Sequence, residues 1–236
     1  TEVIEGKVGV AADTTEVAVD AGFGIVAGGG QTTRTPVPLL PAPSLEGLSA
    51  VVERVPIAFN VPTQPGAQAY RLQIAGAGGF QSPLFDGRAP TTLLRAIDLP
   101  DGDYRLRVRG IDARELEGLN AEQDFTLNAR PVPPILSVPA PGAGVMDEAP
   151  AFEWAAVDGI AHYRLQIAHD RAFTDLLLDR DGLTAPGHVA DQALPLGDYY
   201  WRVLCVDAAE GAGPFSDPQH FRRVPPAPLA ESAVDD

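Results

Sequence analysis

The sequence predicts an all-β protein built from two tandem antiparallel β-sandwiches after a short N-terminal β segment. The first observation is an internal repeat, because the hexapeptide YRLQIA stands at residues 70–75 and again, 93 positions later, at 163–168. Identical segments at a fixed offset are typical of tandem modules. The second observation is a series of short runs in which apolar and polar residues alternate, as in half-buried strands. The third is the 24 glycines and 23 prolines among 236 residues, which favour many turns between short strands.

The N-terminal residues 1–35 form the first predicted segment. Apolar residues alternate with polar ones in two runs, 4–10 and 17–20, and Ala21-Gly22 then predicts a turn. Three short strands are only marginally stable alone, so we expect this segment to pack on its neighbour or to lack part of its own domain. Gly28-Gly29-Gly30 begins a flexible break.

Two proline-rich stretches, 36–43 and 131–139, mark the predicted module boundaries. Frequent prolines exclude a central strand and favour an extended edge segment, so each stretch is expected to supply the edge strand that opens its module. The predicted domains are therefore residues 36–131 for the first sandwich and 132–226 for the second. Residues 227–236 are predicted to be a flexible tail.

Alternation within the modules predicts which side chains face the core. In the first module Tyr70, Leu72 and Ile74 share one face, as do Tyr104, Leu106 and Val108. The second module repeats the pattern at 163–167 and at 199–203, where Trp201 points inward. Helix is limited to a turn or two, near residues 170–173. Roughly seven short strands in about 95 residues are typical of an antiparallel sandwich.

These segments resemble fibronectin type III domains. Leu99-x-x-Gly102-x-Tyr104 and Leu194-x-x-Gly197-x-Tyr199 are similar to the tyrosine corner of that family. Phe152-Glu153-Trp154 is similar to its tryptophan-bearing early strand, although the first module has Val61 in the tryptophan position. The resemblance covers residues 36–226 and implies a sandwich fold, which hosts many binding functions.

The N-terminal segment has a second resemblance. Its residues 3–10 (VIEGKVGV) and 17–24 (VAVDAGFG) resemble the last strands of a FecR-type periplasmic domain, with Phe23 in the usual place of a polar residue. This resemblance implies a bacterial protein located in the periplasm or associated with the cell envelope. Classical members of the family relay a signal from an outer-membrane receptor, and fibronectin-like modules are a different arrangement from theirs.

Four arginines are the candidate binding residues. Arg105, Arg107 and Arg109 alternate along one strand, and Arg71 has the same outward parity on the neighbouring strand. One interpretation is an anion-recognising stripe for a carboxylate-bearing glycan or an acidic partner. The other, which we favour, is local pairing with Glu122 and Asp124 on the next strand, since such pairs are common on sheet faces. Pairing and recognition predict different surroundings for the same side chains.

The remaining chemistry-bearing residues indicate no catalysis, metal or cofactor. The four histidines lack metal-ligand spacing, and the Asp-Gly clusters at 101–103 and 179–182 are those of tight turns. The single cysteine, Cys205, has inward parity and is expected to be buried and inert. No nucleophile elbow, phosphate loop or dinucleotide fingerprint occurs.

Charge and composition limit the partners. A formal net charge of −15 disfavours binding to nucleic acid or an anionic bilayer, and no apolar stretch is long enough for a transmembrane segment. We therefore expect a non-enzymatic envelope protein whose modules contact a protein or a glycan. One alternative is a FecR-type periplasmic signalling component. The other is a carbohydrate-binding accessory module of a larger polysaccharide-active enzyme, which exposed aromatic residues would favour.

Overall fold

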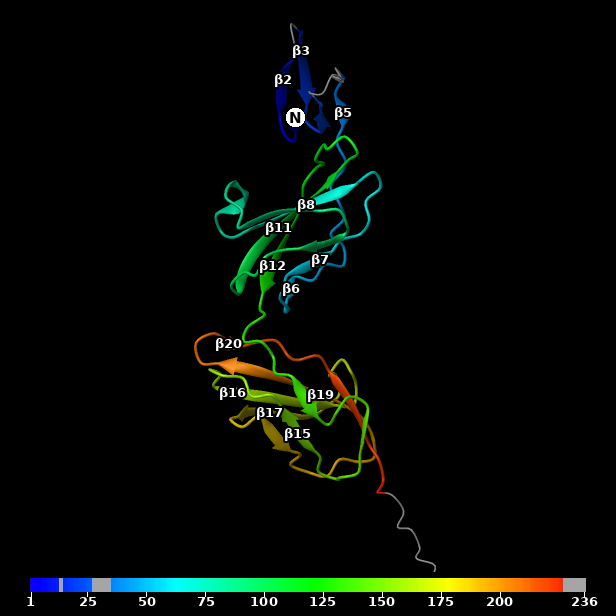
Figure 1. Cartoon of the computed structure of the whole chain (residues 1–236), viewed down its shortest axis with the longest axis vertical. Helices are drawn as coiled ribbons and strands as arrows, with labels where there is room; N and C mark the ends of the chain where they lie inside the picture. Colours follow the sequence, from blue (N-terminus) through cyan, green and yellow to red (C-terminus); the bar gives the residue numbers. More distant parts are fainter. Residues whose placement is uncertain (13–14, 27–34, 227–236) are drawn as a thin grey trace, which may run out of the picture. The chain divides into compact units, whose positions relative to one another are not determined.

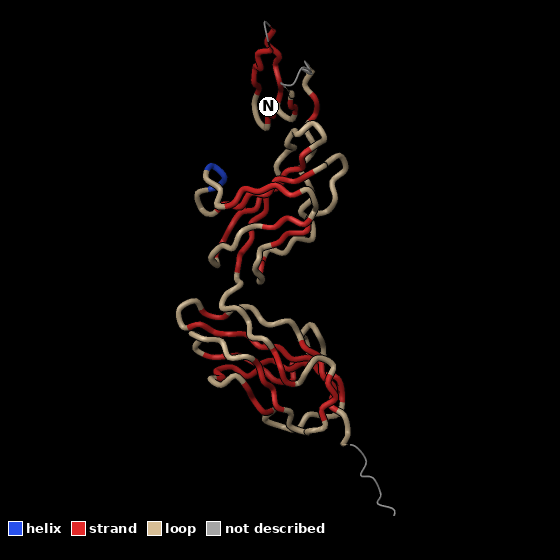
Figure 2. Tube along the Cα trace, in the orientation of Figure 1, coloured by secondary structure: helices blue, strands red, loops and turns tan. Residues whose placement is uncertain are grey.

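The computed structural model describes residues 1–12, 15–26 and 35–226 (Figure 1). The chain divides into two compact units, Thr1–Asn128 and Ala129–Asp236. Nearly all regular structure in the described residues is strand, and the short 3-10 helix η1 (Gly79–Gln81) appears in blue in Figure 2. The predicted boundaries at 35/36 and 131/132 stay predictions. The predicted flexible tail at 227–236 and the glycine-rich break from Gly28 lie outside the described residues.

The N-terminal segment forms two small sheets. A hairpin joins β2 (Lys7–Ala12) to β3 (Thr15–Asp20), and a three-stranded sheet has the order β1-β4-β5, with β1 at Glu2–Val3, β4 at Phe23–Gly24 and β5 at Val37–Pro38. The buried side chains of Val3, Val19 and Ile25 form its core. The proline stretch at 36–43 thus supplies β5 to a sheet of the N-terminal segment. The prediction that this stretch supplies the edge strand that opens the first sandwich is therefore wrong, because β5 pairs with β4.

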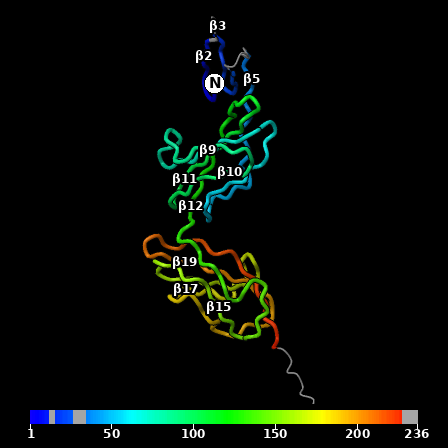
Figure 3. The backbone as a smooth tube through the Cα atoms, in the orientation of Figure 1, coloured from blue at the N-terminus to red at the C-terminus, as the bar shows by residue number. Residues whose placement is uncertain are grey.

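The first sandwich has a two-stranded and a five-stranded sheet. The small sheet pairs β7 (Ala58–Asn60) with β10 (Leu93–Arg95). The large sheet has the order β6-β12-β11-β8-β9, in which only the β6–β12 pair is parallel. Its strands are β6 (Val51–Val52), β8 (Ala69–Ala75), β9 (Phe85–Ala89), β11 (Gly102–Ile111) and β12 (Ala121–Leu127). The chain can be followed through β9, β11 and β12 by colour in Figure 3.

The second sandwich repeats this order with one strand more in each sheet. That sheet has the order β13-β15-β18, with β13 at Leu136–Val138, β15 at Ala151–Trp154 and β18 at Gly187–Val189. The large sheet has the order β14-β21-β19-β16-β17, and β20 pairs with β19. Its strands are β14 (Ala143–Val145), β16 (His162–Ala168), β17 (Leu176–Leu183), β19 (Gly197–Asp207), β20 (Gly211–Ala212) and β21 (Gln219–Arg223). Here the second proline stretch does supply an edge strand, β13.

The two tyrosine corners occupy equivalent places in the two copies. Tyr104 lies opposite Phe125 across β11 and β12, as Tyr199 lies opposite Phe221 across β19 and β21. Tyr104 Oη donates to the carbonyl oxygen of Pro100 at 2.6 Å, and Tyr199 Oη donates to that of Pro195 at 2.9 Å. The predicted fold class, two tandem fibronectin type III-like antiparallel sandwiches, is confirmed.

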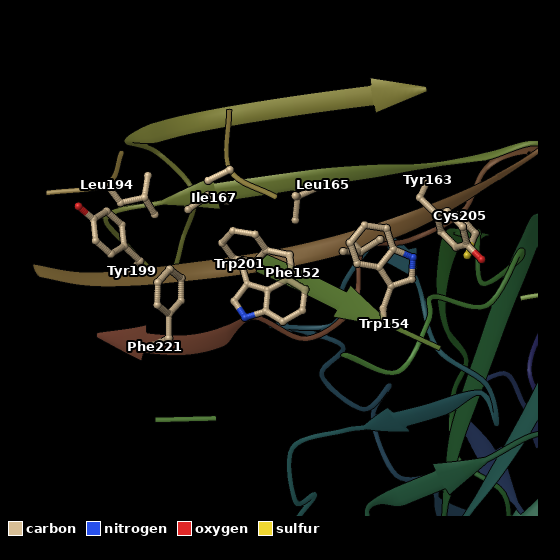
Figure 4. Close-up of a cluster of buried hydrophobic side chains, with 12 residues drawn as sticks. Phe152, Trp154, Tyr163, Leu165, Ile167, Leu194, Tyr199, Trp201, Cys205 and Phe221 are labelled. Atoms are coloured by element: carbon tan, nitrogen blue, oxygen red, sulfur yellow. The ribbon is translucent and has the colours of Figure 1, made fainter. Parts of the chain in front are cut away.

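The core of the second sandwich is aromatic, and its side chains come from both sheets (Figure 4). Phe152 of β15 meets Trp201 of β19 edge-on, with ring centroids 5.2 Å apart, and Phe221 lies 5.6 Å from Phe152. Trp154 packs against Tyr163 at 5.3 Å. The inward parity predicted for both tryptophans is confirmed, since Trp154 is 4% exposed and Trp201 is 0% exposed.

Two further details differ from the sequence prediction. The short helical turn lies at η1, which includes Phe80, rather than at residues 170–173, which form bends and turns. Asp170 explains the second case, because its carboxylate accepts hydrogen bonds from the backbone amides of Ala172, Thr174 and Asp175. A side chain that captures neighbouring amides offers the backbone an alternative to a helix.

Candidate functional site

The four candidate arginines lie together on the large sheet of the first sandwich. Arg71 stands on β8, directly opposite Arg109 of β11, and Arg105 and Arg107 follow on β11 with the same parity. The prediction that the four share one face of adjacent strands is therefore confirmed. We call these four side chains the arginine face.

Carboxylates of the same sandwich form ion pairs with the arginine face. Arg105 Nε lies 2.7 Å from Asp124 Oδ1, and Arg107 lies 2.8 Å from Glu122 Oε1. The two carboxylates are those predicted from strand parity, so the local-pairing interpretation is confirmed for these two arginines. The Arg105 side chain is 53% exposed and that of Asp124 is 75% exposed. An ion pair this exposed to water is weak, because solvent screens it.

The other two arginines share a carboxylate that sequence reasoning did not single out. Glu117 accepts hydrogen bonds at 2.7 Å from both Arg71 Nη1 and Arg109 Nη1. Two like charges directly opposite each other repel, and Glu117 offsets that repulsion. Arg71 also donates bidentate hydrogen bonds to Asp86, from Nε to Oδ1 at 2.8 Å and from Nη2 to Oδ2 at 2.6 Å. These hydrogen bonds hold the pKa of the Asp86 carboxyl below its ordinary value and raise that of Arg71.

The Arg71–Asp86 contact is part of a triad that occurs in both copies. Gln73 Nε2 donates to Asp86 Oδ2 at 2.9 Å, and Gln166 Nε2 donates to Asp179 Oδ2 at 3.0 Å. Arg164 contacts Asp179 as Arg71 contacts Asp86, at 2.6 Å for both oxygens. All three positions are 93 residues apart in the sequence. The arginine and glutamine side chains of the repeated hexapeptide thus connect β8 to β9 and β16 to β17. This role is structural.

A second repeated feature is an arginine stacked on a phenylalanine. The guanidinium of Arg107 lies 3.7 Å from the ring centre of Phe80. Arg202 of the second sandwich lies 3.9 Å from Phe173 and 4.1 Å from Phe215. Cation–π contacts of this kind hold the guanidinium against the sheet. Arg107 is therefore committed to packing as well as to Glu122.

A cleft of about 610 Å³ opens beside Arg105, at one end of β11 and β12. Tyr104 and Phe125 lie in its lining, and polar groups come from Asp103, Arg105 and Asp124. This size falls within the range of sites for small ligands. Asp103, Arg105 and Asp124 project from the outward face of the sheet, whereas the rings of Tyr104 and Phe125 face the core and lie 5.6 Å apart. Only Arg105 of the arginine face belongs to the cleft.

The two copies differ at this place. In the second sandwich the ring of His169 lies 5.3 Å from that of Tyr199, which is 1% exposed. In the first sandwich the residue directly after the hexapeptide is Gly76, where the second has His169. Gly76 lines the cleft and Tyr104 is only half-buried. The first copy thus lacks the imidazole that packs on the corner tyrosine of the second copy.

The single thiol lies in the core of the second sandwich. Cys205 is 0% exposed, and burial raises its pKa to about 11 from an ordinary value of 9.0. The prediction of a buried cysteine is confirmed.

We expect Cys205 to be unreactive toward the thiol reagent DTNB at pH 8 in the folded protein and fully reactive in guanidinium chloride. A thiol pKa that is raised in the folded state stabilises that state below about pH 9 and ceases to do so as the pH rises to about 11. Absorbance of the released chromophore measures the reaction. Rapid labelling of the folded chain at pH 8 would contradict the burial.

Three of the four histidines each lie within about 3 Å of a carboxylate, and His188 lies 3.5 Å from Asp191. His162 lies 3.0 Å from Asp181, His169 lies 2.9 Å from Asp175, and His220 lies 2.9 Å from Asp198. The described residues contain no group of three or more His, Cys, Asp or Glu side chains placed to hold a metal ion. Within the same residues, no helix is long and apolar enough to cross a membrane.

Strand order and the two tyrosine corners define the class of protein: a tandem array with a fibronectin type III-like fold. No family model matches the sequence, and no curated protein matches it. Among solved structures, the chain is similar to a crystal structure of chicken CNTN1 FN1–FN3 domains, at 13% identity and a TM-score of 0.35. The match covers 80% of this chain and 70% of that one. The fold assignment depends on the strand order and the corners, not on this similarity.

Proposed function

We propose that this chain is a non-enzymatic contact protein of the bacterial cell envelope whose first sandwich binds a carboxylate-bearing glycan in the cleft beside Tyr104. The observation that supports the site is the difference between the copies. Two sandwiches share strand order, corner and triad, yet only the first has Gly76 where the second places His169 over the tyrosine ring. The envelope location is supported by the FecR-type resemblance of residues 3–24.

The chemistry of the lining fits a sugar. Sugar rings present several hydroxyl groups, which match the outward side chains that donate and accept hydrogen bonds at this end of the sheet. Arg105 can donate to hydroxyl or carboxylate oxygens, and Asp103 and Asp124 can accept. Because the Arg105–Asp124 pair is mostly exposed, a ligand carboxylate can compete for the guanidinium at small cost.

The other three residues of the arginine face have a structural role. Arg71 and Arg109 are tied to Glu117, and Arg107 is stacked on Phe80. We assign them to stabilising the sheet beside the cleft, with Arg105 as the ligand contact. Their own contact with an acidic partner stays a prediction, which charge reversal at Arg107 tests.

The test uses ¹H–¹⁵N NMR titration of the whole chain with the disaccharide of N-acetylglucosamine and N-acetylmuramic acid. Chitobiose, which lacks the carboxylate, is the comparison ligand. We expect saturable shifts at the amides of Gly76, Tyr104 and Arg105, weaker binding of chitobiose, and weakening as salt rises. Gly76→His places in the first copy the residue of the second and should abolish the shifts.

Two control variants separate the site from the fold. Arg105→Gln should weaken the carboxylate-bearing disaccharide toward the affinity of chitobiose, while Arg107→Glu tests the rest of the arginine face. Far-UV circular dichroism establishes that each variant is folded. Equal binding by the parent chain and Gly76→His would refute the cleft as the glycan site.

A further inference from the structure

A buried charge occupies a core-facing position of the second sandwich. Arg223 follows Phe221 with the same inward parity on β21 and is 5% exposed. It lies opposite Gly197, just as Leu127 lies opposite Gly102 in the first sandwich. Leu127 is an ordinary core residue, 1% exposed. The same structural position therefore holds a leucine in one copy and a guanidinium in the other.

The hydrogen-bonding capacity of Arg223 is only partly used by the described residues. Nη1 donates to the carbonyl oxygen of Val224. Nη2 lies 3.8 Å from Glu148 Oε1, which is too long for a hydrogen bond, and the Glu148 side chain is 78% exposed. Nε is buried and has no hydrogen-bond partner among the residues that the structure describes. A buried guanidinium left in this state is costly, because its charge is taken out of water without a close partner.

Arg223 also lines a cleft of about 340 Å³. Leu194, Pro195 and Leu196 supply apolar walls, and Glu148 lies at the same opening. Leu196 is 61% exposed, which leaves an apolar surface beside the charge. A guanidinium that can bind both oxygens of a carboxylate, next to aliphatic walls, matches an anion with a short apolar body.

We infer that the Arg223 cleft binds a small carboxylate with an aliphatic tail. When no ligand is bound, the Glu148 carboxylate lies near the guanidinium without a hydrogen bond to it. This site is separate from the proposed glycan cleft, since it is in the other sandwich and uses none of the same residues. An incoming carboxylate replaces Glu148 at Nη2, while its tail contacts the leucines. Glu148 then turns fully into solvent.

The first copy shows that the fold does not need this charge. Leu127 takes the place of Arg223, and the residue 93 positions before Glu148 in the sequence is Val55, which carries no charge. Apolar replacement of a buried ion pair is commonly neutral or stabilising. Arg223→Leu is therefore expected to leave the second sandwich folded, so loss of binding in this variant reports on the site and not on stability.

The experiment is an NMR titration of the whole chain with sodium butyrate. Butyramide is the neutral isostere, and sodium chloride keeps the ionic strength equal. We expect saturable shifts at the amides of Glu148, Leu194, Leu196 and Arg223 with butyrate and none with butyramide. Arg223→Leu should raise the dissociation constant about tenfold or more, the loss of one charge-assisted contact. Glu148→Gln should lower it, because the internal competitor is removed.

The outcomes separate the proposal from a structural ion pair. If Arg223 and Glu148 only stabilise each other, Glu148→Gln shifts the unfolding midpoint and confers no tighter binding of butyrate. Non-saturable shifts, equal shifts with butyramide, or weaker binding by Glu148→Gln would each overturn the site. Tryptophan fluorescence establishes folding of the variants, since both tryptophans of the chain, Trp154 and Trp201, lie in this unit.

Discussion

Replacing Trp201 by alanine is expected to lower the free energy of unfolding of the second sandwich by about 3–5 kcal/mol, the usual cost of truncating a buried aromatic residue. Trp201 is 0% exposed and packs edge-on against Phe152. Alanine removes these contacts and leaves a cavity that the rigid strands on either side cannot fill. Urea denaturation followed by the fluorescence of Trp154, which remains in the variant, measures the change.

Trp201→Phe is the matched control. The indole Nε1 of Trp201 is buried without a hydrogen-bond partner among the described residues, so phenylalanine removes an unpaired polar group while keeping most of the apolar volume. We therefore expect a much smaller loss than with alanine. The structurally equivalent residue in the first sandwich is Leu106, 1% exposed. Leu106→Ala should leave the fluorescence midpoint of Trp154 and Trp201 unchanged, and equal losses for Trp201→Phe and Trp201→Ala would contradict the packing.

The second large effect is expected for Tyr70→Phe in the first sandwich. The backbone N–H of Gln64 donates to Tyr70 Oη at 2.8 Å in a buried setting. Phenylalanine keeps the ring but leaves that amide without an acceptor, which costs about 1–3 kcal/mol. Because Tyr70 has no tryptophan near it in its own unit, amide hydrogen exchange of β8 and β11 is the appropriate measurement.

The other repeated tyrosines provide a graded comparison. Tyr163 Oη accepts from the backbone N–H of Val157 at 2.9 Å, in a part-buried setting, so Tyr163→Phe should cost somewhat less. Tyr199→Phe removes a donor to the carbonyl of Pro195, and a loss of about 1 kcal/mol is expected for such a bond. Tyr104→Phe should cost least, since its bond to Pro100 is exposed to solvent. Equal effects at Tyr70 and Tyr104 would show that burial does not decide these energies.

The sequence was sufficient for the strands and their faces, because the two-residue period of a strand is a local property. It placed Trp154 and Trp201 inward and Arg105 and Arg107 outward, and the structure agrees at each position. The prediction that the stretch 36–43 supplies the edge strand of the first sandwich is wrong. Its strand β5 forms its hydrogen bonds with β4 of the N-terminal segment instead. Pairing partners of an edge strand depend on which open edge lies nearby.

The repeated hexapeptide illustrates what the alternation along a strand cannot predict. Its apolar residues predicted a buried face, but the roles of its tyrosine, arginine and glutamine became clear only from their hydrogen-bond partners outside the strand. Gln64 lies six residues before Tyr70, and Asp86 lies fifteen after Arg71. No period in the chain identifies such partners, because strand register and turn length decide which side chains meet.

The sequence by itself determined a tandem all-β architecture, its tyrosine corners and the inward or outward direction of the residues in its long repeated strands. Parity also predicted the carboxylates that pair with Arg105 and Arg107, and the tertiary structure decided the rest of the surface chemistry. It showed that Glu117 joins Arg71 to Arg109 and that Gly76 lines a cleft where the second copy has His169. It also showed that Arg223 is buried without a close carboxylate. The physical reason is that alternation along one strand fixes a side chain's direction, whereas its partners come from strands and loops whose register no local pattern encodes.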